Sequence, residues 1–326
     1  MRQFIVTGLS FVLTSVFFGS FANAQVVTSF SYPGSNDTEP TAISNNGAIV
    51  GILRTQNPST QRGFIRYADG TFGAPIVDPN DSVGYTRALG VNKAGTVVGD
   101  YLTTVGNLNT FHGFILSGGV YSTFDIGGPV STSFFGINDL GHQIGTFGST
   151  IQANQAFLRV GSTTTTYSVP GSLNTFGLAV NNSDVFVGQY TDSTGSVRGY
   201  SINGSNLTLI DVPGAQFTTA TSINDSGLVT GFFEDAANAF HGFFYNGSTY
   251  TSFNVPGTLF SFSAATNNSG KTTGLLVDNN GIVKGFVTSA VPEPGTVALL
   301  ASSFAIGGAF LLKKRKAQKL QIYKIQ

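Results

Sequence analysis

Three histidines are the residues of this 326-residue chain best suited to proton transfer or metal binding: His112, His142 and His241. His112 and His241 occupy the same slot of an internal repeat. In the other copies that slot holds Arg62, Gln155, Arg198 and Lys284. A slot that accepts any long polar side chain is best explained as a solvated or hydrogen-bonded strand position. A metal or catalytic role would need several histidines to converge, and equivalent slots of a ring point away from one another unless they face its axis.

Carboxylates are the second class of candidate, because a pair of them can hydrolyse a glycosidic bond. Glu234-Asp235, Asp78 and Asp81 are the nearest candidates, but adjacent acids on a surface are usually only solvated. The sequence has no G-x-S-x-G, H-E-x-x-H or D-x-[DN]-x-[DN]-G motif. The S-x-D-x-G-x-T-W box of propeller sialidases cannot be present because the chain has no Trp. Since there is no Cys either, thiolate catalysis and Cys-based zinc sites are excluded.

An asparagine recurs at one position of the repeat and could be imagined as a ring of ligands. The column consists of Asn92, Asn138, Asn181, Asn224 and Asn267, with Ser44 in the first copy. Each lies at a fixed offset before a turn residue, which favours a turn-capping role. We therefore predict no catalytic, cofactor-binding or metal-binding residue and no cofactor.

The composition indicates many short strands joined by tight turns. Charged residues make up 10% of the chain, and 42 residues are Gly, which supplies the positive φ that turns need. A helical bundle is excluded by this composition, and disorder is unexpected because 41% of residues are hydrophobic. Residues 25–290 carry 9 basic and 15 acidic side chains, a net charge of −6 that would repel a phosphate backbone. Nucleic-acid binding is therefore not expected.

A repeat of about 43 to 48 residues fills residues 25–290 in six copies. A glycine recurs in every copy, as Gly51, Gly99, Gly145, Gly188, Gly231 and Gly274. An aromatic residue follows in every copy, as Phe64, Phe114, Phe157, Tyr200, Phe243 and Phe286. Each copy is long enough for four short strands, with Asn-x-x-Gly and Pro-Gly turns between them. The in-strand glycines should mark close approach of a neighbouring backbone, and the aromatics should pack between blades.

The ends of the array predict how the fold closes. The sixth copy stops at Thr288 without its last strand, and that strand occurs instead at the N-terminus, over residues 30–34. If the N-terminal strand completes the last blade, no long sheet edge is exposed. We therefore predict an all-β, six-bladed β-propeller of four-stranded blades closed by the N-terminal strand. An open β-solenoid is the alternative, but it would gain nothing from this permutation.

Both termini look like export signals. Residues 1–24 resemble a signal peptide, with Arg2, an apolar run and an A-x-A site that predicts cleavage between Ala24 and Gln25. Near the other end, Pro292-Glu293-Pro294 precedes the apolar run 297–312, which predicts a transmembrane helix in the precursor. A basic cluster follows at once and should stay cytoplasmic; it consists of Lys313, Lys314, Arg315 and Lys316.

Residues 291–316 closely resemble the PEP-CTERM sorting signal of Gram-negative bacteria. One departure is the tail 317–326, since the signal usually ends near its basic cluster. The resemblance implies that an exosortase recognises Pro292-Glu293-Pro294 and that signal peptidase and the inner membrane are met during export. An ordinary C-terminal anchor is the alternative. Within residues 41–286 the unit resembles the bacterial extracellular HAF repeat, with His-Gly-Phe at His112 and His241. That resemblance implies an exported protein and no particular chemistry.

These features predict a non-enzymatic protein of the cell surface or extracellular matrix. Its loops are rich in Ser, Thr, Asn and Gly, which suits contact with exopolysaccharide. A propeller-type glycan hydrolase or lyase is the alternative, and two carboxylates near the ring axis would favour it. A transporter is excluded because only the terminal segments are hydrophobic enough to span a membrane.

Overall fold

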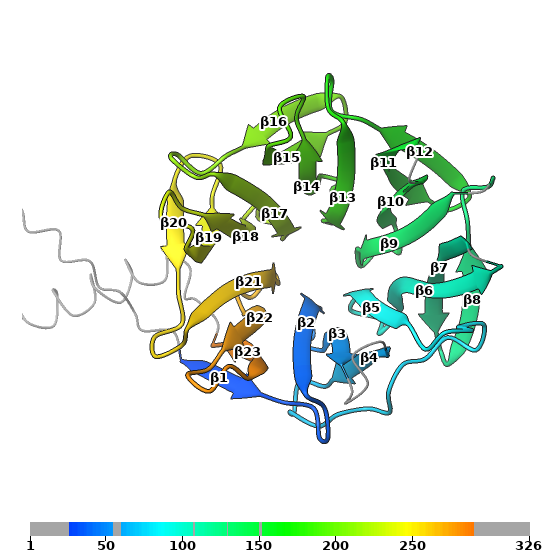
Figure 1. The fold of residues 1–326 in the computed structure, drawn as a ribbon, viewed down its shortest axis with the longest axis horizontal. Helices are drawn as coiled ribbons and strands as arrows, with labels where there is room; N and C mark the ends of the chain where they lie inside the picture. The colour runs from blue at the N-terminus through cyan, green and yellow to red at the C-terminus, as the bar shows by residue number, and fades with distance from the viewer. Residues whose placement is uncertain (1–25, 55–59, 107, 129, 150–151, 290–326) are drawn as a thin grey trace, which may run out of the picture.

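The chain folds into six β-sheets arranged as blades around a central axis (Figure 1). The computed structural model describes residues 26–54, 60–106, 108–128, 130–149 and 152–289. The predicted cleavage site at Ala24 and Gln25, the Pro292-Glu293-Pro294 motif, the apolar run and the basic cluster lie outside the described residues. Nowhere in the described ranges is there a helix that could cross a bilayer. The prediction of an all-β, six-bladed propeller is confirmed.

The blades are numbered here in chain order, and each runs from its innermost to its outermost strand. Blade 1 has β2 (Asp37–Ile43), β3 (Ile49–Arg54) and β4 (Gln61–Arg66). Blade 2 has β5 (Thr86–Val91), β6 (Val97–Val105), β7 (Leu108–Ser117) and β8 (Val120–Phe124). Blade 3 has β9 (Ser131–Ile137), β10 (Gln143–Ser149), β11 (Gln152–Val160) and β12 (Thr163–Tyr167). Blade 4 has β13 (Asn174–Val180), β14 (Phe186–Thr191), β15 (Val197–Asn203) and β16 (Asn206–Ile210). Blade 5 has β17 (Phe217–Ile223), β18 (Val229–Glu234), β19 (Phe240–Tyr245) and β20 (Tyr250–Phe253). Blade 6 has β21 (Phe260–Thr266), β22 (Thr272–Val277), β23 (Val283–Thr288) and β1 (Val27–Phe30).

The N-terminal strand β1 completes blade 6. It pairs antiparallel with β23, with Val27 opposite Thr288 and Phe30 opposite Gly285. Beyond that ladder, the N–H of Ser289 donates to the carbonyl oxygen of Val26 at 2.9 Å. The strand begins and ends earlier than predicted, because Tyr32 starts the turn that the Pro-Gly pair makes. The N–H of Ser35 donates to the carbonyl oxygen of Tyr32 across this turn.

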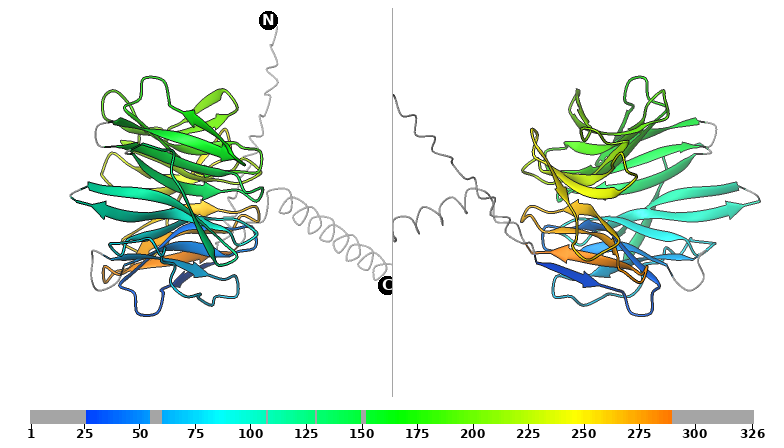
Figure 2. Two further views of the ribbon diagram at one scale, coloured as in Figure 1. Left: turned by 90° about the vertical axis from the view of Figure 1, so that its right-hand side faces the viewer. Right: turned by 60° about the vertical axis from the view of Figure 1, so that its left-hand side comes forward.

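Blade 1 departs from the predicted four strands. Its sheet has three strands, and the chain that follows pairs with β4 in isolated bridges: Gly63–Ile76 and Arg66–Phe72, which are antiparallel, and Gln61–Tyr85, which is parallel. The two antiparallel bridges differ in register by one residue, so they do not continue as one regular ladder. Blade 2 departs from the prediction because its strands β6 and β7 are long. Their hairpin projects furthest from the body (cyan to green in Figure 2).

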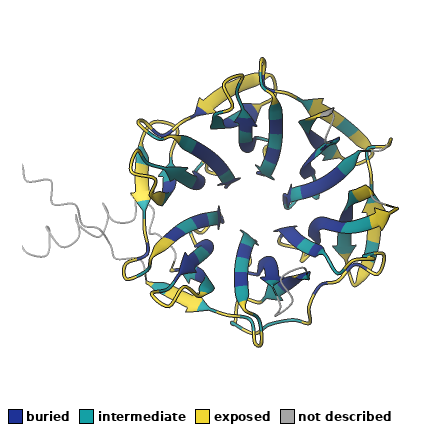
Figure 3. Ribbon diagram, viewed as in Figure 1, coloured by how far each residue is buried: buried dark blue, intermediate teal, exposed yellow. Residues whose placement is uncertain are grey.

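The core lies between the blades, where the third-strand aromatics are buried as predicted (Figure 3). All six of them are 0% exposed: Phe64, Phe114, Phe157, Tyr200, Phe243 and Phe286. The glycine on the neighbouring second strand leaves room for each ring. At Gly188, for example, a Cβ would overlap the carbonyl oxygen of Phe176 and lie 3.1 Å from the ring of Tyr200. The predicted close approach at these glycines is therefore confirmed.

Two repeated features were not predicted. Every innermost strand has a β-bulge at the same position, which turns the bulged side chain away from the regular alternation. The bulged residues are Thr41, Leu89, Phe135, Leu178, Thr221 and Ala264. Near the start of each innermost strand, a buried hydroxyl accepts a backbone N–H from the preceding interblade connector. These hydroxyls belong to Thr38, Thr86, Thr132, Thr175, Thr218 and Ser261.

Candidate functional site

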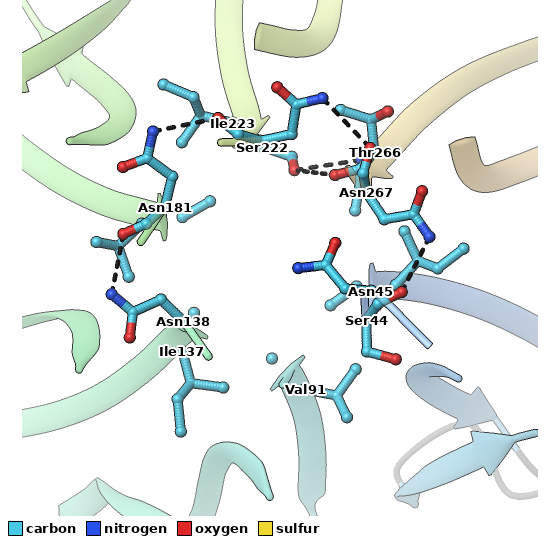
Figure 4. Close-up of a pocket in the computed structure, with 18 of the residues that line it drawn as sticks. Ser44, Asn45, Val91, Ile137, Asn138, Asn181, Ser222, Ile223, Thr266 and Asn267 are labelled. Carbon is cyan, nitrogen blue, oxygen red and sulfur yellow. Dashed lines mark hydrogen bonds between the residues drawn. The ribbon is translucent and has the colours of Figure 1, made fainter. Parts of the chain in front are cut away.

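The asparagine column forms a ring of hydrogen bonds around the axis, here called the asparagine belt (Figure 4). Each Oδ1 caps its own turn, as predicted; that of Asn138, for example, accepts the N–H of His142 at 2.9 Å. Each Nδ2 also reaches the next blade. The five links are Asn92 to the carbonyl of Asn138 (3.2 Å), Asn138 to Asn181 (2.9 Å), Asn181 to Asn224 (3.1 Å), Asn224 to Asn267 (3.3 Å) and Asn267 to Ser44 (3.0 Å). Ser44 has no amide, so the sixth link is not made.

The residues that follow form a second ring at one mouth of the channel. Asp139 and Asp225 are the two acids of this ring, and they accept hydrogen bonds on both oxygens. Asp139 accepts the N–H of Lys93 at 2.7 Å and the amide of Asn45 at 2.8 Å. Asp225 accepts the backbone N–H of Asn182 at 2.8 Å and that residue's side-chain amide at 2.7 Å. Asp225 joins blade 5 to blade 4, and Asp139 joins blade 3 to blade 2 and, through Asn45, to blade 1.

The channel itself is narrow. About 90 Å³ of it is wide enough for water, and its walls carry five of the six bulged residues and most members of both polar rings. Pockets that enclose small molecules measure roughly 300–1,000 Å³. The channel therefore has room for a few waters but not for a sugar ring.

The three histidines lie in separate places, each beside a carboxylate. His112 Nδ1 is 2.9 Å from Asp125 Oδ2, and His142 Nδ1 is 2.7 Å from Asp184 Oδ1. His241 lies between Asn254, 3.1 Å from Nδ1, and Asp235, 3.0 Å from Nε2. The shared slot of His112 and His241 is thus a hydrogen-bonded strand position. Within the described ranges, no group of three His, Asp or Glu side chains is arranged to hold a metal ion.

The acidic candidates are also scattered. Asp235, at the end of β18 in blade 5, accepts the N–H of Ala239 at 2.9 Å, and this bond and His241 hold its pKa below the usual range. Asp81 lies in the connector between blades 1 and 2, where it accepts the hydroxyl of Thr86 at 2.8 Å. The structure therefore does not bring Glu234-Asp235 together with Asp78 and Asp81.

Asp78 is the exception among these candidate carboxylates because it is buried. It is 1% exposed, and its Oδ1 accepts the N–H of Asn80 at 2.9 Å. Its Oδ2 has no hydrogen-bond partner among the described residues. Burial raises the pKa of this carboxyl, although the N–H of Asn80 opposes the shift. Val212 and two other valines occupy the equivalent connector position elsewhere, so blade 2 alone buries a carboxyl there.

Two grooves away from the axis offer more space than the channel. Groove A, about 350 Å³, lies between blades 5 and 6, and it is lined by Phe240, His241, Asn254, Leu259 and Phe260, among others. Groove B, about 360 Å³, lies over blade 6. Its lining includes Val27, Ser29, Pro256, Asp278 and Lys284. Both volumes fall within the range of small-molecule sites.

Groove A is bordered by exposed aromatic side chains that were not predicted from the sequence. Phe240 is 39% exposed and Phe260 is 40% exposed. They form the two ends of a chain of five contacting rings, with centroid separations from 4.7 to 6.2 Å. The chain runs Phe240, Phe217, Phe232, Phe262 and Phe260. The signal in the sequence was the spacing of Phe217 and Phe260, which fill the same slot in successive copies.

Comparisons with known proteins identify the fold. Neither the protein-family models nor the curated proteins include a match. Among solved structures, AofleA from Arthrobotrys oligospora is 10% identical with a TM-score of 0.53, covering 82% of this chain and 91% of that one. TolB from Acinetobacter baumannii is 12% identical with a TM-score of 0.52, covering 75% and 64%. The β-propeller domain of the Trilobed protease from Pyrococcus furiosus is 10% identical with a TM-score of 0.50, covering 78% and 82%, and it has an open velcro topology. At these identities the likeness shows a shared β-propeller architecture, which this chain closes with β1.

Proposed function

We propose that this chain is a non-enzymatic exported protein of the cell surface or extracellular matrix that contacts exopolysaccharide. One observation carries the proposal: the space suited to a ligand lies in grooves A and B and not at the axis. Groove A combines exposed aromatic rings with a neutral amide, and groove B combines hydroxyls with the Asp278–Lys284 pair. Apolar walls with a few polar groups suit binding of a neutral, hydroxyl-rich polymer.

The two acids that line the channel among the described residues are not arranged as an enzyme's acid pair, and this supports the non-enzymatic part. A glycoside hydrolase needs one carboxyl that gives up a proton and a second carboxylate facing it. Asp139 and Asp225 are the acids closest to the axis, and N–H donors occupy their oxygens. Both are committed to holding blades together.

Incubation of the exported protein with the producer's own exopolysaccharide tests this function. We expect the polymer to be retained by the protein and its chain length to stay unchanged. Cleavage that disappears on substituting a single Asp or Glu would establish a glycan hydrolase or lyase instead. Failure of the protein to retain any polysaccharide fraction would contradict the binding role.

Sorting by an exosortase is the second part of the proposal and rests on the sequence resemblance at the C-terminus. Intact mass spectrometry of surface material tests it. We expect a chain that starts at Gln25 and lacks everything beyond the Pro292-Glu293-Pro294 region. We also expect less protein at the surface of a strain without its exosortase. Detecting residues 313–326 on the surface form would contradict processing.

A further inference from the structure

Grooves A and B adjoin one another. Both are lined by Val255 and Thr258, which belong to the connector between β20 and β21. Groove A lies on the blade 5 side of this connector and groove B on the side of β1 and β23. The Thr258 hydroxyl donates to the carbonyl oxygen of Val255 at 2.7 Å, which fixes the shape of the ridge between them. A ligand longer than one groove can therefore enter both.

Groove A offers a flat apolar wall beside neutral polar groups. Phe260 packs almost parallel to Phe262, at 6.1 Å and 11°, which holds its ring in place while leaving it 40% exposed. Asn254 also lines this groove, is exposed, and contacts His241 through its Oδ1. A pyranose ring has this same division, with C–H groups on one face and hydroxyls at its edge. Aromatic faces favour such contacts because they bury apolar area at little cost in side-chain entropy.

Groove B offers charged groups that already compensate one another. Lys284 Nζ lies 2.7 Å from Asp278 Oδ2. This ammonium and the backbone N–H of Ile282 lower the pKa of Asp278, so the two form an ion pair at neutral pH. An ion pair of this kind presents both donors and an acceptor to a neighbouring hydroxyl, without favouring a charged ligand. Ser29 adds an exposed hydroxyl on β1.

The aromatic wall is specific to this side of the ring. In the other copies, the slot of Phe260 is occupied by Asp37, Tyr85, Ser131, Asn174 and Phe217. Arg87 covers Tyr85, with its guanidinium 5.7 Å from the ring centroid. Phe217 lies between Phe232 and Phe240. The sixfold repeat therefore does not reproduce this surface six times.

We propose that grooves A and B are adjoining subsites for one neutral polysaccharide chain, with one sugar stacked on Phe260 in groove A and hydroxyls of a neighbouring sugar bound by the Asp278–Lys284 pair in groove B. This inference rests on the proposed function and narrows it to one track per propeller.

Titration calorimetry of the full exported chain tests the proposal, with the producer's exopolysaccharide divided by anion exchange into neutral and acidic fractions. We expect the neutral fraction to bind, and its oligosaccharides to bind at least tenfold more tightly than its monosaccharides. Phe260→Ala should weaken binding about tenfold, and Lys284→Met severalfold. Phe260→Tyr should stay within threefold of the unchanged protein. The matched control is Leu209→Ala, which truncates a 55% exposed apolar residue on β16 and should have no effect.

The outcomes separate the two levels of the proposal. If the unchanged protein binds the neutral fraction and both Phe260→Ala and Lys284→Met bind equally well, the track is wrong and the proposed function stands. Preference for the acidic fraction would also overturn the neutral assignment. If no fraction binds, both the track and the polysaccharide contact are wrong. Melting temperatures of all variants show whether a loss reflects unfolding, and Lys284→Met remains informative if Phe260→Ala does not fold.

Discussion

At the scale of single residues, Asp78 is the clearest departure from the repeat. A carboxyl with an unpartnered oxygen is buried where Val169, Val212 and Val255 occur in other connectors. A buried polar atom without a hydrogen bond costs about 1–3 kcal/mol. We infer that blade 2 retains a destabilising residue that the other copies do not have.

Replacing this carboxyl with an amide should stabilise the protein in a pH-dependent way. The pKa of Asp78 is raised on folding, so the folded state holds its proton over a pH range in which the unfolded chain has lost it. The free energy of unfolding contributed by this group therefore falls as pH rises from about 4 through the raised pKa. Asp78→Asn keeps an oxygen for the N–H of Asn80 and removes the cost of ionising a buried carboxyl, so it should raise the free energy of unfolding at pH 7 and have less effect near pH ~4. Urea unfolding between pH 4 and 7 measures the effect.

Asp69 provides the control with the opposite sign. It is exposed, and the backbone N–H and hydroxyl of Thr71 hold its pKa below the usual value. Its contribution to stability is present above pH 4 and is lost as pH falls through that lowered pKa. Asp69→Asn should therefore have a lower free energy of unfolding than the unchanged protein at pH 7, and this difference should shrink as the pH falls. If the free energy of unfolding depends on pH in the same way for Asp78→Asn and the unchanged protein, then folding does not raise the pKa of Asp78.

The candidate site could be predicted only in part from residue types. The buried third-strand aromatics were predicted because each recurs beside an invariant glycine, and close packing follows from the pairing. Phe240 and Phe260 obey the same strand alternation, but their exposure depends on what the neighbouring blade places over them. At Tyr85 that cover is Arg87, and at Phe260 there is none among the described residues. A contact between blades is not encoded in any one copy.

At the scale of elements, the asparagine belt joins each turn to the next blade. Oδ1 stabilises the turn, and Nδ2 stabilises the interface, so one side chain serves both. The natural exception, Ser44, separates these roles. Its Oγ accepts the N–H of Ala48 at 3.0 Å and caps the turn, but it cannot reach blade 2.

Substitutions at Asn224 can separate its turn cap from its bond to the next blade. Asn224→Ser should keep the cap and lose the bond to Asn267, which costs about 1 kcal/mol of unfolding free energy. Asn224→Ala should lose both and cost about 2 kcal/mol. The reverse change, Ser44→Asn, should add the missing sixth link and stabilise by about 1 kcal/mol. Chemical denaturation measures all three; if Ser and Ala at residue 224 are equally destabilising, the cap contributes nothing.

The repeat predicted the strand order and the turns. It did not predict the β-bulges of the innermost strands or the buried hydroxyls that accept an N–H from each connector. Turns are local, so Asn and Gly at fixed spacing predict them; Asp184 takes the turn conformation with φ of 58° in place of glycine. The bulges and the buried hydroxyls such as Thr175 respond to the adjoining strand or connector. Their recurrence was visible in the sequence, yet its meaning depends on the closed ring.

At the scale of the whole molecule, closure by β1 determines whether blade 6 has an exposed edge. Phe30 also packs into the core between blades 6 and 1, with its ring 6.4 Å from Phe64 and 4.7 Å from the guanidinium of Arg66. The strand therefore contributes both hydrogen bonds and apolar packing.

Removing residues 25–33 should destabilise the entire propeller. Loss of a packed aromatic costs about 3–5 kcal/mol, so we expect the melting temperature to fall by roughly 10 °C or more. Calorimetry of the truncated and complete chains measures this, with Thr28→Ala, on the exposed side of β1, as the control. Adding a peptide of residues 25–34 should restore part of the loss. An unchanged melting temperature after truncation would mean that β1 does not hold the ring closed.

The pairing of Val26 with Ser289 also sets the order in which the molecule can be completed. These residues are 263 positions apart, so the first strand to leave the ribosome bonds to the last. At about 5–20 residues per second, β1 waits roughly 13 to 50 seconds for its partner. Blades 2 to 5 are each built from contiguous chain and can form during that interval, whereas blade 6 cannot. A chain stopped before β23 therefore leaves β1 and the outer edge of β22 without their shared partner, and these exposed edges can pair with strands of a neighbouring molecule.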